Sequence, residues 1–252
     1  MQVAGKVVVV TGGGNGIGRA MCEAFHRAGA ARVVVADIDP AAARVVATPI
    51  GGAAFKCDVG KEKDILHVIE ETEHQFGPIA LFCSNAGIGG GGRRAFIDRT
   101  EEEWRKMFAT NLDGVFHVFQ VAARHMTERA EAGDKFGRLV ATSSLASLFG
   151  TARNEHYAGT KAALNALCRA LGVELARYGV TANAILPGWI KSDMTAGIMA
   201  NDKFVANVMP RIPARRFGEP SDFGGIAVYL MSKASSYHTA DCFVIDGGYT
   251  AF

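Results

Sequence analysis

Tyr157 and Lys161 are the two side chains in this 252-residue sequence whose types and spacing best suit proton transfer. They are four residues apart, so on a helix they lie on the same face, one turn from each other. A phenol ordinarily titrates at about 10, and a neighbouring ammonium lowers its pKa by favouring the phenolate. The pair is therefore a candidate acid–base catalyst, although a tyrosine and a lysine with this spacing are also common on solvated helix faces.

Ser144 is a third candidate for the same chemistry. It lies thirteen residues before Tyr157, in the run Ala141-Thr142-Ser143-Ser144, and its hydroxyl could hold a substrate carbonyl. His156, directly before Tyr157, faces another side of the helix and is not expected to be catalytic. Whether these residues catalyse anything depends on whether the rest of the chain supplies a redox cofactor.

A glycine-rich turn near the N-terminus supplies a site for such a cofactor. The apolar run over residues 6–11 predicts a buried strand, and residues 19–28 predict a helix that ends at Gly29. Between them, the spacing Thr11-Gly12-x-x-x-Gly16-x-Gly18 exposes backbone N–H groups at a helix N-terminus, where phosphate oxygens bind. It departs from the G-x-G-x-x-G pattern, and glycine clusters alone are usually only turns. The residues expected to contact a dinucleotide here are Gly12, Asn15, Gly16, Ile17 and Gly18.

Asp37 indicates which dinucleotide would bind. It ends the next predicted strand, over residues 32–36, and lies nineteen residues beyond Gly18. An acidic residue at about this separation binds the adenosine ribose hydroxyls of NAD. Its charge would repel the additional phosphate of NADP, and neither Asn15 nor Ile38 supplies a cation. Asp37 could instead be a loop carboxylate or a helix cap, but Asp39-Pro40 already provides a cap. We therefore expect NAD, with Asp37 and Ile38 beside its adenosine.

Strands and helices alternate along the whole chain. The predicted strands cover residues 6–11, 32–36, 53–57, 79–83, 137–142, 180–186 and 241–246, and the longest predicted helices cover 101–128 and 153–178. This order is typical of an α/β fold with a Rossmann-like doubly wound parallel sheet, which binds ligands at the carboxyl ends of its strands. The candidate residues follow strands or lie on the next helix, apart from Asn111.

These motifs, in this order, resemble the short-chain dehydrogenase/reductase family in its single-domain form. The resemblance extends from Val7 to Gly248 and implies one dinucleotide-binding catalytic domain over residues 1–252. Cys57-Asp58-Val59 resembles the segment that lines the adenine, and Asn85-Ala86-Gly87 resembles a motif after the fourth strand. Asn183 and Pro187-Gly188-Trp189-Ile190 resemble the segment that packs on the nicotinamide. Ser84 stands where many members have asparagine, and Ser192 replaces the usual threonine while keeping its hydroxyl.

The resemblance also assigns roles to a tetrad of Asn111, Ser144, Tyr157 and Lys161. It implies that Ser144, not Ser143, binds the substrate oxygen and that Tyr157 exchanges the proton. Lys161 would lower the pKa of Tyr157 and hold the nicotinamide ribose. Asn111 would hold a water between Lys161 and solvent, although a helix kink or back-bond is the alternative. Further implied cofactor contacts are Asp58, Val59, Asn85, Ala86, Gly87, Tyr157, Lys161, Pro187, Gly188, Ile190 and Ser192.

The segment 189–217 interrupts the alternation and is rich in apolar residues. A packed pair of helices would explain it. The resemblance places a substrate lid here, so we expect a small, flexible helical cover that excludes water. An apolar cover favours an apolar or acyl substrate over a sugar. The glycine-rich loop 87–94 is expected to form a mobile rim of the site.

The expected function is the NAD-dependent interconversion of a secondary alcohol and a ketone by hydride transfer. One alternative is reduction of 3-oxoacyl carrier-protein or CoA thioesters, which Asp37 and the absence of a concentrated basic patch disfavour. Another is a non-catalytic redox sensor or scaffold, which is disfavoured because all four tetrad positions are filled.

Composition argues against other classes of function. A net charge of +2 gives no reason to expect nucleic acid or an anionic membrane as a partner. The longest apolar stretches are strand-sized and the N-terminus does not resemble a signal peptide, so we expect a cytoplasmic protein. The five scattered cysteines and seven histidines show no spacing for disulfides or a metal site. The resemblance, with a helix over 153–178 that is apolar on more than one face, implies a homotetramer.

Overall fold

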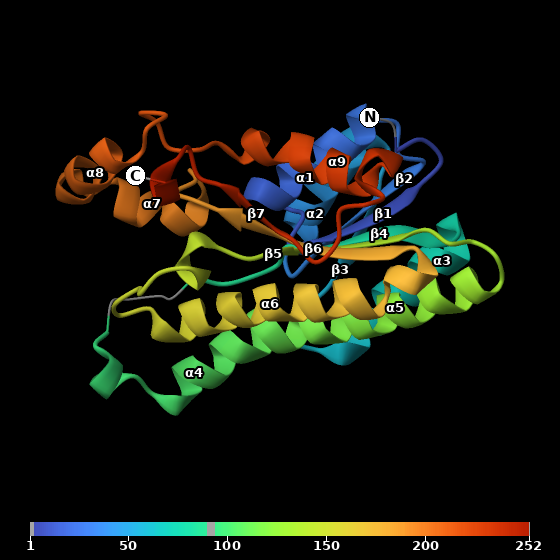
Figure 1. Ribbon diagram of the computed structural model, residues 1–252, viewed down its shortest axis with the longest axis horizontal. Coiled ribbons are helices and arrows are strands. Elements are labelled where there is room, and N and C mark those ends of the chain that lie inside the picture. Colours follow the sequence, from blue (N-terminus) through green and yellow to red (C-terminus); the bar gives the residue numbers. More distant parts are fainter. Residues whose placement is uncertain (1–2, 90–93, 252) are drawn as a thin grey trace.

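A parallel sheet of seven strands forms the centre of the computed structural model, which describes residues 3–89 and 94–251 (Figure 1). The strands are β1 (Val7–Thr11), β2 (Arg32–Asp37), β3 (Ala53–Lys56), β4 (Ile79–Ser84), β5 (Gly137–Thr142), β6 (Val180–Pro187) and β7 (Cys242–Ile245). Their order across the sheet is β3-β2-β1-β4-β5-β6-β7. The predicted strands are confirmed, each within one residue at either end.

Helices cover both faces of the sheet. On one face lie α1 (Gly16–Arg27), α2 (Pro40–Ala47) and α9 (Gly224–Met231), and on the other lie α3 (Glu62–Phe76), α5 (Gly114–Glu131) and α6 (Glu155–Glu174). α4 (Glu101–Phe108) runs into α5 and packs against α6. Two short helices, α7 (Asp193–Met199) and α8 (Asp202–Val208), lie beyond the carboxyl ends of the strands, at the left of Figure 1. In the described part of the chain, no helix is long and apolar enough to cross a membrane.

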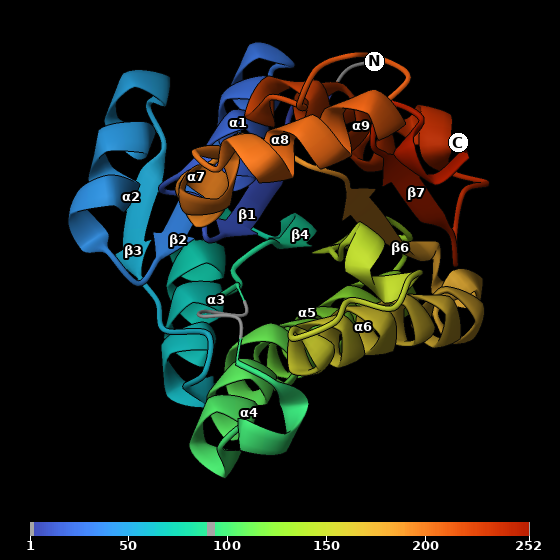
Figure 2. The same cartoon turned by 90° about the vertical axis from the view of Figure 1, so that its left-hand side faces the viewer.

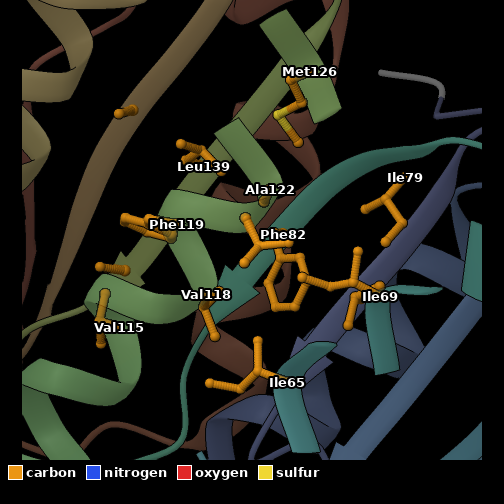
Figure 3. Close-up of a cluster of buried hydrophobic side chains, with 14 of the residues drawn as sticks. Ile65, Ile69, Ile79, Phe82, Val115, Val118, Phe119, Ala122, Met126 and Leu139 are labelled. Carbon is orange, nitrogen blue, oxygen red and sulfur yellow. The ribbon is translucent and has the colours of Figure 1, made fainter. Parts of the chain in front are cut away.

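The strands are apolar at successive positions because both faces of the sheet are buried. In β1, Val8 and Val10 face the cluster under α1 and α9, whereas Val7 and Val9 face the opposite cluster. That second cluster is filled by α3 and α5, with Phe82 of β4 packed among side chains of both helices (Figure 3). The valine-rich runs that predicted buried strands therefore have a direct packing cause.

The position of the site follows from the strand order. β1 lies between β2 and β4, so the chain leaves β1 toward one edge of the sheet and β4 toward the other. Loops that leave adjacent strands in opposite directions form a crevice at the carboxyl ends, and ligands bind at this switch point in doubly wound sheets. The loops after β1, β4 and β5 meet there (Figure 2).

The two long predicted helices are present, but the first is interrupted and the second is shorter than predicted. The helix expected over 101–128 is divided into α4 and α5 by a π-helical turn, Ala109–Asp113, which contains Asn111. The helix expected over 153–178 is α6, followed by a short 3₁₀ turn, Ala176–Tyr178. A π-turn often occurs at functional sites, and it fits the alternative of a helix irregularity at Asn111.

The segment 189–217 forms a small packed unit. Val208, Ile212 and Phe217 are buried together, with Trp189 stacked edge-on against Phe204. Most apolar side chains of the segment therefore pack against one another instead of facing outward, as the alternative of a packed helix pair predicted. Residues 90–93 of the glycine-rich loop lie outside the described residues, so the expectation of a mobile rim is untested there.

Candidate active site

Close backbone approaches explain the glycine spacing of the turn after β1. Gly12 has φ +61, and a Cβ at this position would lie 2.7 Å from the Cα of Ala86. A Cβ on Gly18 would collide with the carbonyl oxygen of Gly12 and lie 2.5 Å from Nδ2 of Asn85. The turn, the start of α1 and the loop after β4 are therefore packed without room for side chains. The N–H of Gly16 donates to Oδ1 of the cap residue Asn15 at 2.7 Å, and the N–H groups of Ile17 and Gly18 come next in the first turn of α1, where helix starts leave donors without intrahelical partners for an anion to bind.

Asn85 joins this turn to the strand that carries the catalytic candidates. Its Nδ2 donates to the carbonyl of Gly12 at 3.1 Å, and its Oδ1 accepts from Oγ1 of Thr142 at 3.0 Å. Thr11 Oγ1 accepts from the N–H groups of Asn85 and Ala86, each at 3.2 Å. The predicted Asn85-Ala86-Gly87 motif is thus placed beside the predicted cofactor turn, and Thr142 is a member of the network that the sequence did not reveal.

Lys161 extends the network to α6. Its Nζ donates to the carbonyl oxygen of Thr142 at 2.7 Å, and the residue is 4% exposed. Burial lowers the pKa of Lys161 to about 8, because removal from water disfavours the ammonium. Ser143 Oγ donates to the carbonyl of Lys161 at 2.8 Å. Ser143 therefore supports the backbone of α6, which leaves Ser144 as the hydroxyl available to a substrate.

Tyr157 and Ser144 meet at the carboxyl end of β5. Ser144 Oγ accepts from the N–H of Ala146 at 3.1 Å. Burial raises the pKa of Tyr157 above its ordinary value, and the nearby hydroxyl of Ser144 lowers it in part. Lys161 Nζ lies 5.6 Å from the centroid of the Tyr157 ring. Burial therefore sets the net direction of the shift, and the expectation that Lys161 lowers this pKa stays a prediction.

Asn111 and Lys161 flank the backbone of Gly87. A Cβ on Gly87 would lie 3.3 Å from Asn111 Oδ1 and 3.4 Å from Lys161 Nζ. The amide of Asn111 is fully buried; its Oδ1 accepts from the N–H of Ile88 at 2.8 Å and its Nδ2 donates to the carbonyl of Ile88 at 3.0 Å. The π-turn thus directs Asn111 to the loop after β4, and all four tetrad positions are brought to one place. The water expected at Asn111 stays a prediction.

Asp37 lies at the other end of the crevice. Its Oδ2 accepts from the N–H of Gly14 at 2.9 Å, and its Oδ1 accepts from the N–H of Asp39 at 3.0 Å. An ionised carboxylate accepts about four hydrogen bonds, so this partly exposed side chain retains capacity for hydroxyl groups. Asp39 caps α2 by accepting from the N–H of Ala41 at 2.8 Å, as predicted. Ile38, beside Asp37, is 63% exposed.

The segment after β3 has mainly local contacts. Asp58 Oδ1 accepts from the N–H of Gly60 at 3.1 Å, and its Oδ2 lies 3.2 Å from Nζ of Lys61. Val59 is buried, and a Cβ on Gly114 of α5 would lie 2.8 Å from its carbonyl oxygen. Asp58 and Val59 follow β3 at the same edge of the sheet as Asp37, where the sequence placed them.

The residues predicted to pack on the nicotinamide lie in two places: Pro187, Gly188 and Ile190 at and after the end of β6, and Asn183 within β6. Pro187 and Ile190 are buried, and a Cβ on Gly188 would lie 2.7 Å from the Cα of Asp246. Asn183 is buried within β6, where its Nδ2 donates to His238 O and its Oδ1 accepts from Asp241 N, both at 3.1 Å. Asn183 therefore holds the chain that leads into β7, and the expectation that its segment packs on the nicotinamide stays a prediction.

A contact between the glycine turn and α7 was not foreseen. Nδ2 of Asn15 donates to Oδ2 of Asp193, the first residue of α7, and Ser192 caps that helix. These residues, with Gly16 and Arg19, line a pocket of about 400 Å³. The two partners are 178 positions apart, so no local signal in the sequence could have joined them.

A doubly wound parallel sheet with a phosphate-type glycine turn, joined through Asn85 to a Ser–Tyr–Lys group whose lysine is buried, defines a dinucleotide-binding oxidoreductase. The family model described as enoyl-(acyl carrier protein) reductase matches residues 12–250. The chain belongs to the short-chain dehydrogenase/reductase family.

Individual relatives show how far the similarity extends. The 5-keto-D-gluconate 5-reductase of Escherichia coli (strain K12) is 34% identical over 252 residues, covering 98% of this chain and 96% of that protein. The structure of a short-chain type dehydrogenase/reductase from Mycobacterium marinum matches with a TM-score of 0.92 and 32% identity, covering 100% of this chain and 98% of the other. A gluconate 5-dehydrogenase from Burkholderia cenocepacia J2315, solved with NADP and tartrate, matches with a TM-score of 0.91 and 30% identity, over 100% and 97% of the two chains. Family membership supports an oxidoreductase with a nicotinamide dinucleotide cofactor.

Proposed function

We propose that this protein is an NAD-dependent oxidoreductase that interconverts a secondary alcohol and a ketone, with residues 1–252 acting as one catalytic domain. One observation carries the proposal. A continuous series of hydrogen bonds leads from the carbonyl of Gly12 through Asn85 and Thr142 to the ammonium of Lys161. The turn that can hold a dinucleotide is thereby fixed relative to the group that can move a proton.

The nicotinamide, when bound, supplies or accepts the hydride. In reduction, Tyr157 donates its phenolic proton to the carbonyl oxygen, and in oxidation it accepts the proton from the alcohol. Ser144 Oγ hydrogen-bonds the same substrate oxygen. Lys161 holds the nicotinamide ribose hydroxyls, and Asn111 holds a water that connects Lys161 to solvent. A buried, neutral phenol beside Ser144 is in the right protonation state to act as the acid.

The turn and the crevice fit a dinucleotide, because Gly12 and Gly18 leave bare backbone where a Cβ would intrude. Asn15, Gly16 and Ile17 lie at the start of α1 for the phosphates, and Asp37 and Ile38 lie beside the adenosine. The remaining proposed contacts are Asp58, Val59, Asn85, Ala86, Gly87, Tyr157, Lys161, Pro187, Gly188, Ile190 and Ser192. The carboxylate of Asp37 favours NAD over NADP, since it accepts ribose hydroxyls and repels a phosphate.

Asp37→Asn should reduce the preference for NADH over NADPH. A hydrogen bond to a charged group contributes about 1.5–3 kcal/mol, so the ratio of the two kcat/KM values should fall by about tenfold or more. Asp134→Asn is the matched control, because it removes the same charge from an exposed side chain between α5 and β5. An unchanged ratio in Asp37→Asn, measured with either cofactor at fixed substrate, would show that this carboxylate does not select the cofactor.

We propose an apolar or acyl substrate because of the side chains near the tetrad. Leu148 and Phe149, which follow Ser144, are each 47% exposed, and Met194 of α7 is 56% exposed. Met194 reaches the opposite rim, since its Cγ lies 3.0 Å from the place of a Cβ on Gly89. A relative from Mycobacterium avium, the 3-oxoacyl-[acyl-carrier-protein] reductase MabA, favours 3-oxoacyl thioesters as a second candidate, and the relative from Escherichia coli favours a keto-sugar acid.

A substrate panel separates these candidates. NADH oxidation should be measured with a cyclic ketone such as cyclohexanone, with acetoacetyl-CoA and with 5-keto-D-gluconate. The highest kcat/KM should fall on one of the first two compounds. Preference for 5-keto-D-gluconate would overturn the apolar substrate class. Tight NADH binding without turnover of any compound would favour the redox sensor or scaffold instead.

We also propose a cytoplasmic homotetramer. Ala162, Ala166 and Ala170 are exposed at every fourth position of α6, and Phe116 of α5 is 46% exposed. Small residues repeated on one face allow close helix approach, and a helix that is apolar beyond one stripe needs a second partner. Light scattering on the purified protein tests the assembly: a mass of one subunit would contradict it.

A further inference from the structure

Arg99 has an unusually buried side chain in a position that no proposed role explains. It follows a 3₁₀ turn, Phe96–Asp98, and precedes α4, and its side chain is only 4% exposed. Arginine is seldom buried unless its donors are satisfied. Here Nη1 lies 3.1 Å from Nε2 of His156, and Nη2 donates to the carbonyls of Arg94 at 3.3 Å and Arg153 at 3.0 Å.

The hydrogen-bond partners of Arg99 come from three separate segments around the tetrad. Arg94 follows the glycine-rich loop after β4. Arg153 lies directly before α6 and has φ +64, a left-handed conformation that is uncommon for a non-glycine residue. His156 lies in the first turn of α6 and is adjacent to Tyr157 in the chain. The guanidinium therefore holds together the two loops and the helix start that precede the proposed acid.

The first turn of α6 lacks the usual local support. Asn154 is its N-cap residue, yet the Asn154 side chain makes no capping hydrogen bond. The backbone bond from the N–H of Ala158 to the carbonyl of Asn154, at 3.0 Å, closes the turn that contains Tyr157. Side-chain caps normally stabilise helix starts. Here the start of α6 is supported by the bond from the N–H of Arg153 to Glu155 Oε1 at 2.7 Å and by the buried contact between Arg99 and His156.

The contact fixes the protonation of His156. A guanidinium has only donors, so Nε2 of His156 accepts and the proton of the neutral ring is on Nδ1. Burial and, next, the charge of Arg99 lower the pKa of His156 below its ordinary 6.5, whereas Glu155 and Glu103 raise it. Glu155 is on α6, and Glu103 on α4 lies 3.7 Å from Nη1 of Arg99. The positive group of Arg153 lies in the adjoining loop.

We propose that Arg99 and His156 are positioning residues that fix the first turn of α6 and thereby hold the hydroxyl of Tyr157 toward Ser144. This inference rests on the proposed role of Tyr157 in proton transfer. It assigns a function to the histidine beside the acid that does not require His156 to contact substrate. Protonation of His156 removes the lone pair that accepts from Arg99, so the contact is present above the pKa of His156 and lost as the pH falls through it.

Four variants test the proposal. Arg99→Met removes the guanidinium, His156→Leu removes the acceptor, and His156→Gln keeps an acceptor that does not titrate. Arg105→Met is the matched control, since Arg105 on α4 is 77% exposed and pairs with Glu101 of the same helix. The measurements are kcat with whichever of acetoacetyl-CoA, cyclohexanone or 5-keto-D-gluconate is turned over, the dissociation constant for NADH, and hydrogen exchange at Ala158.

Arg99→Met and His156→Leu should lower kcat by about tenfold to a hundredfold, as expected for a misplaced catalytic group, with unchanged NADH affinity. Exchange at Ala158 should become faster by about tenfold or more, which needs no substrate. His156→Gln should retain kcat at neutral pH and lose the decline expected of the wild type as the pH falls through the lowered pKa of His156. Arg105→Met should match the wild type in every measurement.

Two results would overturn the positioning role: unchanged kcat and exchange in Arg99→Met, or a loss of kcat that is matched by equal loss of NADH affinity. An acid decline that persists in His156→Gln would contradict the pH dependence. If Tyr157→Phe retained turnover, the proposed function itself would fail. If Tyr157→Phe lost turnover while Arg99→Met did not, only this inference would fail.

Discussion

Tyr157→Phe should bind NADH with unchanged affinity and lose most of its turnover. The substitution removes one oxygen from a partly buried ring beside Ser144, so the shape of the site is retained. General acid–base groups contribute typically about 10²–10⁴-fold to rate, and kcat should fall by that factor. This loss corresponds to about 3–5 kcal/mol of transition-state stabilisation.

Tyr237→Phe is the matched control for this variant. Tyr237 is 102% exposed, so loss of its hydroxyl should change neither kcat nor NADH affinity. Fluorescence titration with NADH and steady-state rates with the best panel substrate would be compared for both variants. Near-wild-type turnover in Tyr157→Phe would refute the proposed acid, and weakened NADH binding would show that the phenol serves the cofactor instead.

Gly18→Ala should destabilise the protein and abolish NADH binding. The new methyl group would collide with the carbonyl of Gly12 and lie 2.5 Å from Nδ2 of Asn85. Both neighbours are held by their mutual hydrogen bond of 3.1 Å, so neither can move without opening the turn. Overpacking in a well-packed region costs about 1–3 kcal/mol, and the melting temperature should fall by about 2–4 °C for each kcal/mol in a chain of this size.

Gly225→Ala distinguishes crowding from a general effect of replacing glycine. Gly225 lies in α9, and a Cβ there would have no heavy atom within 4 Å. Alanine favours a helix interior over glycine by about 1 kcal/mol, so this variant should be as stable as the wild type or more so. Calorimetry and NADH titration check both variants. A Gly18→Ala protein that bound NADH normally would show that the tight turn is not the cofactor site.

The sheet was predictable from sequence because its strands are buried on both faces. Val7 to Val10 pack into two different cores, so the run had to be apolar throughout, and the β-branched residues distinguish it from a helix. The glycine turn was predictable for a related reason, since contacts at Gly12 and Gly18 exclude any side chain. In both places, contacts with distant parts of the chain restrict several neighbouring positions to one type of residue, and this restriction is visible in the sequence.

Other features depended on contacts that leave no local pattern. The bond between Asn15 and Asp193 and the partners of Arg99 join segments that are distant in the chain. Asn183 is an ordinary polar residue until its partners near β7 are known. The direction of the pKa shift at Tyr157 was also beyond a sequence argument, because it depends on how deeply the phenol is buried and not only on the nearby charge of Lys161.

The hydrogen bonds of Asn85 link the glycine turn to Lys161, whereas Asp37 lies outside this network. Substitutions in the two parts of the site should therefore have different consequences. Substitutions at Gly12, Asn85, Thr142 and Lys161 should combine non-additively, because each shares a partner with the next. Among the described residues, the carboxylate of Asp37 accepts only from Gly14 and Asp39. We therefore expect that substitutions at Asp37 can change the preference between NAD and NADP without moving the residues that transfer the proton.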